Sequence, residues 1–519
     1  MQRVTLLASL VEASERVSAA SSRLTKVREL AQVLRGLEPA EVSIGVLYLS
    51  GEVPQGRCGI GPSALRAADA APDAAAPSLT LAEVDREIAT IAALCGKGVA
   101  TRRAEALRAL FARGTGAERS FLARLLLGEL RQGALAGVMT DAIALAAGVP
   151  IGEVRRAIMY APHLGAVAQA ALHDRVNGFA QFQLEVLSPI APMLAQTAAD
   201  PADALRQLAG AEAAFEWKVD GARIQVHKSG ATVCVYTRNL NEVGDSLPEI
   251  VEQVRALPSA QLILDGEAVA YDAADRPHPF QVTMRRFGRK LDVGQLQAEL
   301  PMRAFYFDCL RLDHESLAER PARERFQALD AAIPASLRIP RLITASEIEA
   351  QSFYDAALAA GHEGVMAKAL DAPYEAGNRG ASWLKIKRAH TLDLVVLAAE
   401  WGHGRRTGTL SNLHLGALEP TTGEYVMLGK TFKGLTDRML AWQTEQLLAR
   451  EVRADGITVY VRPELVVEIA FSDLQSSPRY PGGLALRLAR VKRYRTDKTP
   501  EQADTIETVR RIYAASLGQ

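Results

Sequence analysis

A lysine between two acids is the first group in this sequence that could do chemistry. It lies in the segment EWKVDGARIQV, residues 216–226. If the segment is a strand, alternate side chains share a face, so Glu216, Lys218 and Asp220 point together and Trp217 points into a core. A lysine amine attacks only after losing its proton; nearby cations lower its pKa and acids raise it. Lys218 is therefore a candidate nucleophile, although a ladder of surface ion pairs on an edge strand explains the segment alone equally well.

Carboxylates recur inside apolar stretches further along the chain. The run LILDGEAVA places Asp265 and Glu267 on one face of a predicted strand. Buried carboxylates need a partner such as a metal ion or hydroxyl groups, although a polar strand end is the plainer interpretation. The segment HEGVMAKAL adds Glu363 as a candidate for metal and Lys368 as a candidate for phosphate.

Two lysines and two aromatic residues complete the set. The segment SWLKIKRAH puts Lys385 and Lys387 on one strand face. Two such lysines repel each other unless an anion lies between them, so a nucleotide phosphate is the economical interpretation. In AFYFDCLRL, Phe305 and Phe307 share a face, which fits either an ordinary core or a platform on which a base stacks.

In this order and spacing, the segments resemble the motif series of the covalent nucleotidyltransferases, which comprise ATP-dependent polynucleotide ligases and mRNA capping enzymes. The series is KxDGxR at 218–223, DGE at 265–267, FD at 307–308, EGVMAK at 363–368 and WLKIK at 383–387.

The flanking regions narrow the resemblance to ligases. Residues 486–504 resemble the last ligase motif, with Leu488-Ala489 where relatives often have an aromatic–proline pair. Residues 41–66 and 118–139 resemble the DNA-binding domain of larger ATP-dependent DNA ligases. The resemblance covers nearly the whole chain and is greatest to bacterial ligases of mycobacterial and actinobacterial type.

This resemblance implies a mechanism and a set of contacts. Lys218 would attack the α-phosphate of ATP, release pyrophosphate and become lysyl-AMP. AMP would then pass to the 5′-phosphate of a nick in double-stranded DNA, and the 3′-hydroxyl would displace it. The implied nucleotide contacts are Glu216 to adenine, Phe307 stacking on the base, Arg223 and Arg238 to ribose and phosphate, Glu267 to ribose, and Arg379, Lys385 and Lys387 to phosphate. Glu267 and Glu363 are the implied ligands of Mg²⁺.

The last motif carries a basic stretch that allows two interpretations. A solvated, charged tail is the plainer one. By resemblance, Arg495 and Lys498 swing over ATP to orient the leaving pyrophosphate, and the domain then rotates away so that DNA can bind.

The elements that position these groups form three predicted domains. Residues 1–187 carry helical periodicity, as at 23–37, 81–94 and 121–148, and predict an all-helical DNA-binding domain, with a flexible connection at 61–80. Residues 188–389 alternate strands with helices and predict an α+β nucleotidyltransferase domain. Residues 390–519 carry short strands and one interior helix, which predicts an OB-fold β-barrel.

Basic residues near predicted helix ends are candidate DNA phosphate contacts in the helical domain, although solvent or a pair along the helix is the more common partner of any one arginine. They are Lys97, Arg102, Arg103 and Arg131, together with Gly133.

Composition sets the outer limits. The 519 residues contain 60 Lys+Arg and 60 Asp+Glu, so the net charge is zero, which excludes a histone-like or acidic disordered chain but not a local basic groove. We expect the basic residues to line one groove and the acids to face outward. The four cysteines include no CxxC pair, and the sequence shows no signal peptide or membrane span, so we expect a cytoplasmic protein, working as a monomer.

Two other functions remain open on the sequence. An RNA ligase or capping-type nucleotidyltransferase would share the central motifs. As the resemblance implies, however, capping enzymes and small RNA ligases lack a helical domain of this kind. A DNA-bridging protein with a decayed active site would not need every charged motif residue. The sequence does not separate a replication role from repair or recombination.

Overall fold

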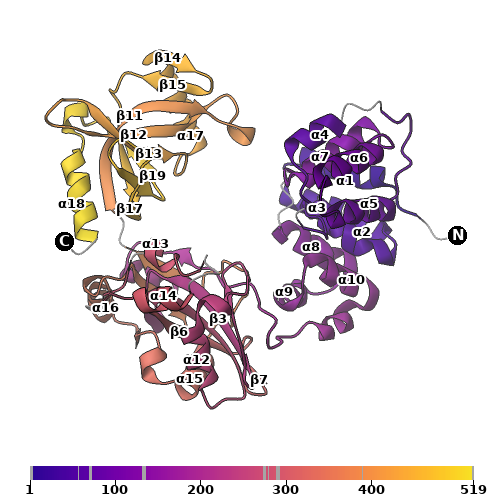
Figure 1. Cartoon of the computed structure of the whole chain (residues 1–519), viewed down its shortest axis with the longest axis horizontal. Coiled ribbons are helices and arrows are strands. Elements are labelled where there is room, and N and C mark those ends of the chain that lie inside the picture. The colour runs from indigo at the N-terminus through magenta and orange to yellow at the C-terminus, as the bar shows by residue number, and fades with distance from the viewer. Residues whose placement is uncertain are drawn as a thin grey trace. The chain divides into compact units, whose positions relative to one another are not determined.

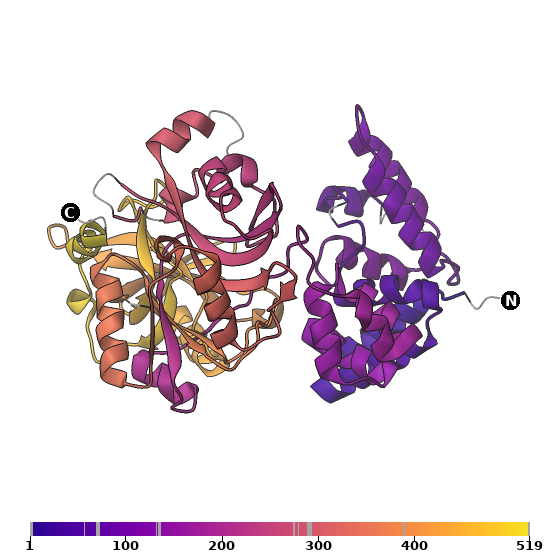
Figure 2. The ribbon, with the colours of Figure 1, turned by 90° about the horizontal axis from the view of Figure 1, so that it is seen from below.

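The computed structural model describes residues 4–56, 58–68, 73–130, 132, 136–272, 276–278, 280–287, 293–387 and 390–516. The chain forms two compact units, which can be followed by colour in Figures 1 and 2. The first contains residues 1–193 and 375–378, and the second contains residues 194–374 and 379–519. In the described residues, no helix has the length and hydrophobicity needed to cross a membrane.

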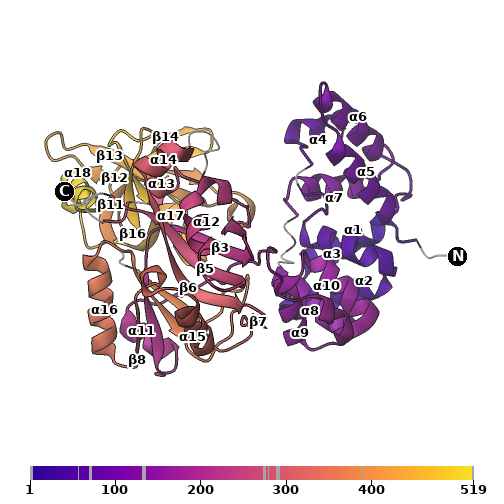
Figure 3. The same ribbon diagram turned by 60° about the horizontal axis from the view of Figure 1, so that its bottom comes forward.

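The first unit is a helical bundle, as the periodicity predicts (Figure 3). Its apolar helix faces form one continuous buried core. Thr80 and Thr115 begin helices α5 and α7 with complete capping boxes. The helices are α1 (Leu7–Ala19), α2 (Arg23–Gly36), α3 (Val42–Ser50), α4 (Pro62–Ala68), α5 (Leu81–Ala93), α6 (Val99–Phe111), α7 (Gly116–Leu126), α8 (Ala136–Ala147), α9 (Ile151–Tyr160) and α10 (Leu164–Asp174).

Helix α4 corrects one expectation, because it lies inside the stretch 61–80 that the Ala/Pro-rich composition predicts as a flexible connection. Leu65 and Ala68 are buried in the core of the bundle, and this burial outweighs the low complexity of the surrounding sequence.

A short segment far along the chain also belongs to the first unit. The Glu375 amide donates to Met193 Sδ at 3.4 Å. Gly377 has φ +70°, and a Cβ at this position would lie 3.4 Å from Ala191 Cβ. Residues 375–378 therefore pack against the end of the helical unit. In the sequence, they are flanked on both sides by residues that belong to the second unit.

Two five-stranded sheets build the central part of the second unit, with strand orders β1-β10-β9-β2-β8 and β4-β3-β5-β6-β7. Helices α11 (Pro201–Gln207) and α16 (Glu347–Ala359) pack on the first sheet, and α12 (Pro248–Arg255) and α15 (Ala322–Ala332) pack on the second. The strands are β1 (Gln196–Thr197), β2 (Ala213–Lys218), β3 (Ala222–Ser229), β4 (Thr232–Thr237), β5 (Gln261–Ala270), β6 (Met302–Leu312), β7 (Glu315–Ser316), β8 (Arg341–Thr344), β9 (Gly364–Ala369) and β10 (Trp383–Lys387).

The C-terminal part is rich in strands, as predicted, but its sheet is open. The order is β13-β12-β11-β15-β14, and β16 pairs with β11 and β19. No ladder in the described residues joins β13 to β19, although the Val491 amide donates to the Lys433 carbonyl at 2.9 Å. The predicted OB-fold β-barrel is therefore an OB-like domain whose sheet is not closed. Its elements are β11 (His390–Trp401), β12 (Leu410–Leu418), β13 (Tyr425–Thr431), β14 (Glu451–Asp455), β15 (Thr458–Val461), β16 (Val466–Phe471), β17 (Asp473–Ser476), β18 (Leu484–Arg487), β19 (Arg490–Tyr494), α17 (Asp437–Leu448) and α18 (Ile506–Ser516).

Candidate active site

Lys218 ends strand β2 where three strands meet. Strand β9 lies between β2 and β10, and Gly364 of β9 is in register with Lys218 on one side and Lys387 on the other. Glu363, the preceding residue, places its carboxylate 2.7 Å from the Lys218 amine and 2.5 Å from the Lys387 amine. Glu363 thus places a carboxylate of the chain itself between Lys218 and Lys387.

The charges of this cluster control the reactivity of the lysine. Burial alone lowers the pKa of Lys218, but Glu363 and Glu267 outweigh it, and the net pKa is raised. Burial raises the pKa of Glu363, whereas Lys218 and Lys387 bring it down to about 2. Burial and Glu363 raise the pKa of Asp220 to about 6. The amine is thus held protonated, and attack requires the acids to release it.

Arg223 and Glu267 face each other across strands β3 and β5. Arg223 donates to both carboxylate oxygens of Asp265, at 3.0 and 2.6 Å, and Tyr374 donates to the same aspartate at 2.7 Å. Burial raises the pKa of Glu267 to about 7, against the lowering effect of Lys218 and Arg223. These acids lie among the cations, so the expectation that acids face outward is wrong at this site.

Glu216 and Phe307 lie together beside the lysine cluster. Glu216 is 1% exposed, and its two carboxylate oxygens contact Arg341 Nε at 2.7 Å and Lys368 Nζ at 2.5 Å. Lys368 Nζ is also 4.5 Å from the centre of the Phe307 ring. Lys368, expected at phosphate, is instead buried against Glu216, because it lies further along β9 than Gly364, the residue in register with Lys218.

The remaining predicted site residues lie in three places. Burial and the cations of Lys387 and Arg379 lower the pKa of Lys385, so these three residues share one positive region. Arg238 is exposed just after β4. Within the C-terminal part, Arg495 and Lys498 pair with Asp393 at 2.8 and 2.6 Å.

Two candidates of the helical domain have structural partners. Arg103 donates to the carbonyls of Ile91 and Leu94 at 3.2 and 2.8 Å, at the end of α5. Arg102 donates to the Cys95 carbonyl at 2.5 Å. Lys97 is exposed. The remaining two candidates, Arg131 and Gly133, lie outside the described residues.

Sequence reasoning missed the roles of Arg341 and Arg325. Arg341 is in register with Glu216 on the neighbouring strand β8, and nothing in its own segment indicates that contact. Asp308, which follows Phe307 in the FD motif, is fully buried in an ion pair with Arg325. Arg325 carries no motif signal, since only the sheet and helix packing bring it to Asp308.

Two of the predicted site residues, Glu267 and Glu363, were candidates for binding a metal ion. In the parts of the chain that the structure describes, no three His, Cys, Asp or Glu side chains form a group that could hold a metal ion. Glu363 does raise the pKa of Glu267, so the two carboxylates are close. Mg²⁺ commonly binds one or two carboxylates together with substrate phosphates, and this pair fits that pattern.

Comparison with known proteins places this site in a family. Residues 192–387 match the model "ATP dependent DNA ligase domain", 406–498 match "ATP dependent DNA ligase C terminal region" and 63–144 match "DNA ligase N terminus". A "Probable DNA ligase" of Anaeromyxobacter dehalogenans (strain 2CP-C) is 59% identical over 98% of this chain and 99% of its own length. One from Mycolicibacterium gilvum (strain PYR-GCK) is 54% identical over 98% of this chain and 99% of its own.

The fold agrees with a solved structure described as Pmar-Lig_PreS3, which has a TM-score of 0.62 at 18% identity and covers 94% of this chain and 99% of its own. A helical region, a two-sheet nucleotidyltransferase domain and an OB-like domain together define a nucleotidyltransferase of ligase architecture. The chain belongs to the ATP-dependent DNA ligase family. It is an enzyme that uses ATP to join DNA.

Proposed function

We propose that Lys218 is the nucleophile of this ligase and carries the AMP. The observation that carries the proposal is the meeting of Lys218, Glu363 and Lys387 at adjacent strand ends. The deprotonated amine forms a P–N bond to the α-phosphorus of ATP, and the bond to the β-phosphate oxygen breaks so that pyrophosphate leaves with its electron pair. Fixed cations neutralise the charge that develops on the phosphate oxygens.

The rest of the site supports a consistent placement of ATP. We assign the base to a site formed by Phe307 and Glu216, which Lys368 holds together, beside the nucleophile. Arg223 and Glu267 serve the ribose, with Arg238 as a further ribose or phosphate contact. Lys385, Lys387 and Arg379 form the positive region for phosphate. Glu267 and Glu363 would hold Mg²⁺, which would supply additional positive charge at the phosphates.

The substrate that we propose is a nick in double-stranded DNA. AMP moves from Lys218 to the 5′-phosphate, and the 3′-hydroxyl then attacks that phosphate and releases AMP. The four cysteines are unpaired in the structure, which supports the expectation of a reducing, cytoplasmic location. The monomeric state stays a prediction, and so do the division into three domains and a role in repair or in replication.

One assay tests the nucleophile. The protein is incubated with labelled ATP or GTP and Mg²⁺, and then with nicked DNA or nicked RNA. We expect an acid-labile AMP adduct from ATP and joined DNA. Lys218→Ala should lose the adduct but still seal a nick that already carries 5′-AMP. Exposed Lys433→Ala serves as the matched control. An adduct retained in Lys218→Ala contradicts the assignment, and labelling by GTP favours an RNA-directed enzyme.

A second assay tests Arg495. Arg495→Ala should slow enzyme adenylation far more than sealing of a pre-adenylated nick, because its implied role concerns pyrophosphate only. Arg493→Ala is the control, since Arg493 is 65% exposed and pairs with Glu468 on the neighbouring strand. Equal slowing of both steps would exclude the proposed role for Arg495.

A further inference from the structure

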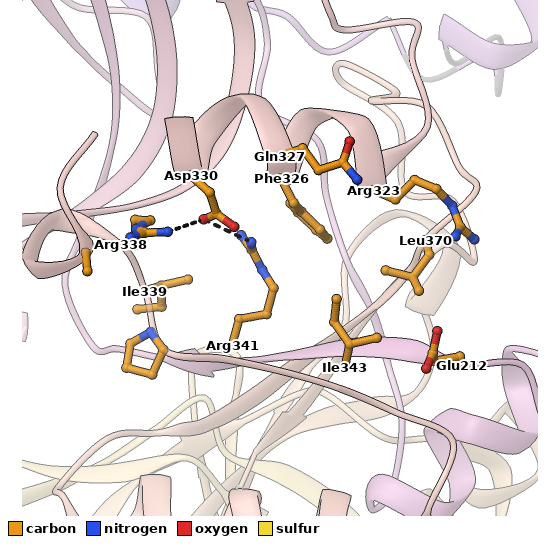
Figure 4. Close-up of a pocket in the computed structure, with 12 residues that line it drawn as sticks. Glu212, Arg323, Phe326, Gln327, Asp330, Arg338, Ile339, Arg341, Ile343 and Leu370 are labelled. Carbon is orange, nitrogen blue, oxygen red and sulfur yellow. Dashed lines mark ion pairs between the residues drawn. The ribbon is translucent and has the colours of Figure 1, made fainter. Parts of the chain in front are cut away.

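A cavity of about 670 Å³ opens between strand β8 and helix α15 (Figure 4). Phe326 and Asp330 of α15, Ile343 of β8 and Leu370 line it. Figure 4 shows Arg338 and Arg341 directed at Asp330 across the cavity. Their guanidinium nitrogens lie 2.7 and 3.9 Å from the Asp330 carboxylate, respectively.

Arg341 connects this cavity to the proposed base site. Its guanidinium carbon is 3.6 Å from the centre of the Phe326 ring, which fixes the plane of the group. From there Nε donates to Glu216 at 2.7 Å, and Nη2 donates to the Phe307 carbonyl at 3.4 Å. One side chain thus contacts both residues assigned to the base. The Arg341 side chain is 12% exposed, so most of it is shielded from water.

The Glu216 carboxylate therefore has a fixed orientation. Arg341 holds one oxygen and Lys368 holds the other, so rotation of the carboxylate breaks two charge-assisted hydrogen bonds. A carboxylate oxygen has two lone pairs, so each oxygen can still accept one more hydrogen bond. An ionised carboxylate cannot donate, so it accepts from an amino group and repels a carbonyl oxygen.

We propose that Arg341 is a positioning residue for nucleobase selection: it aims Glu216 at the 6-amino group of a purine and so favours adenine over guanine. The proposal rests on the assignment of Glu216 and Phe307 to the base site. Arg341 itself does not touch the nucleotide. Its effect should therefore appear only with substrates that offer a 6-amino group.

The cavity provides a chemical test of this role. Truncation of Arg341 to alanine leaves an opening between the cavity and Glu216, lined by the Phe326 ring and the Asp330 carboxylate. Free guanidinium is planar and carries the same donors as the lost side chain. It should enter from the solvent and restore part of the contact.

The experiment measures the initial rate of lysyl-nucleotide formation with ATP, GTP and purine riboside triphosphate, which lacks the 6-amino group. In Arg341→Ala, KM for ATP should rise about tenfold or more, as for loss of a charge-assisted contact, with little change in kcat. KM for purine riboside triphosphate should change less than about twofold. Millimolar guanidinium should lower KM for ATP in this variant. Arg338→Ala, which lacks the contact to Glu216, is the matched control and should show neither effect.

The outcomes separate the two levels of the proposal. Equal increases in KM for ATP and purine riboside triphosphate in Arg341→Ala would mean a structural role and overturn the inference. If Glu216→Gln also leaves the ratio of the KM values for the two substrates unchanged, the base site itself is assigned wrongly. If Glu216→Gln abolishes the difference in KM between ATP and purine riboside triphosphate and Arg341→Ala does not, only the proposed role of Arg341 is refuted. A thermal unfolding curve of each variant shows whether the protein is folded at the assay temperature.

Discussion

The buried ion pair between Arg325 and Asp308 should determine the stability of the nucleotidyltransferase domain. Both side chains are 0% exposed, and Arg325 Nε and Nη2 lie 2.7 and 3.0 Å from the two carboxylate oxygens. Nη1 donates to the carbonyls of Arg320 and Ala372 at 2.7 and 3.0 Å. Replacing Arg325 with methionine keeps much of the volume but leaves a buried carboxylate and two buried carbonyls without these donors.

Removal of one partner from a buried ion pair costs about 3–5 kcal/mol. A domain of this size loses about 2–4 °C of midpoint temperature per kcal/mol. Arg325→Met should therefore lower the unfolding transition of this domain by roughly 6–20 °C. Differential scanning calorimetry measures the shift. Lysyl-AMP formation at 20 °C reports whether the site next to Asp308 is intact below the transition.

The control is Arg323→Met on the same helix. Arg323 is 49% exposed and pairs with Asp371, which is 82% exposed, so its loss should cost less than about 1 kcal/mol. The double variant Arg325→Met, Asp308→Leu should lose less stability than the sum of the single variants, because it leaves no unpaired charge. A transition for Arg325→Met within about 1 °C of Arg323→Met, or strict additivity, would refute the reasoning.

Three further predictions concern pH, backbone and helix capping. The pKa of Glu267 is raised to about 7, so protonated Glu267 stabilises the fold fully below about pH 4.5, and this stabilisation is lost as the pH rises through 7. In EDTA, Glu267→Gln should therefore raise the melting temperature more at pH 8 than at pH 5. The same increase at both pH values would contradict this. Gly364 has φ +142°, and a Cβ there would lie 2.1 Å from the Ile386 carbonyl oxygen, so Gly364→Ala should cost at least about 2 kcal/mol more in urea unfolding than Gly361→Ala, which meets nothing closer than 3.7 Å. Arg103→Ala should destabilise the helical unit by about 1–3 kcal/mol through the carbonyls at the end of α5; an equally stable variant with weaker DNA binding would make Arg103 a DNA contact instead.

Alternation along single strands was enough to predict which face each motif residue occupies. Lys385 and Lys387 do share a face, while Leu384 and Ile386 are buried on the other. The positions of the main strands and helices also follow from local periodicity, because each element covers an apolar core. Helix α4 is an exception, since tertiary burial decides its structure.

Pairing between strands could not be predicted in the same way. The pair Lys385 and Lys387 suggested a phosphate as their anion, but Glu363, just before β9, contacts Lys387 and also Lys218. The partners of Glu216 come from β8 and β9, more than a hundred residues away in the chain. Strand order is set by packing of distant segments, and a single sequence contains no local signal for it. Closure of the C-terminal sheet depends on the same long-range geometry.

The packing of residues 375–378 with the first unit has a consequence for truncation. A fragment that begins at residue 194 would keep these four residues but lose Ala191 and Met193, which they contact. This segment lies between Tyr374, which donates to Asp265, and Arg379, beside Lys385. Removing the helical unit therefore leaves residues 375–378 without the part of the first unit on which they pack.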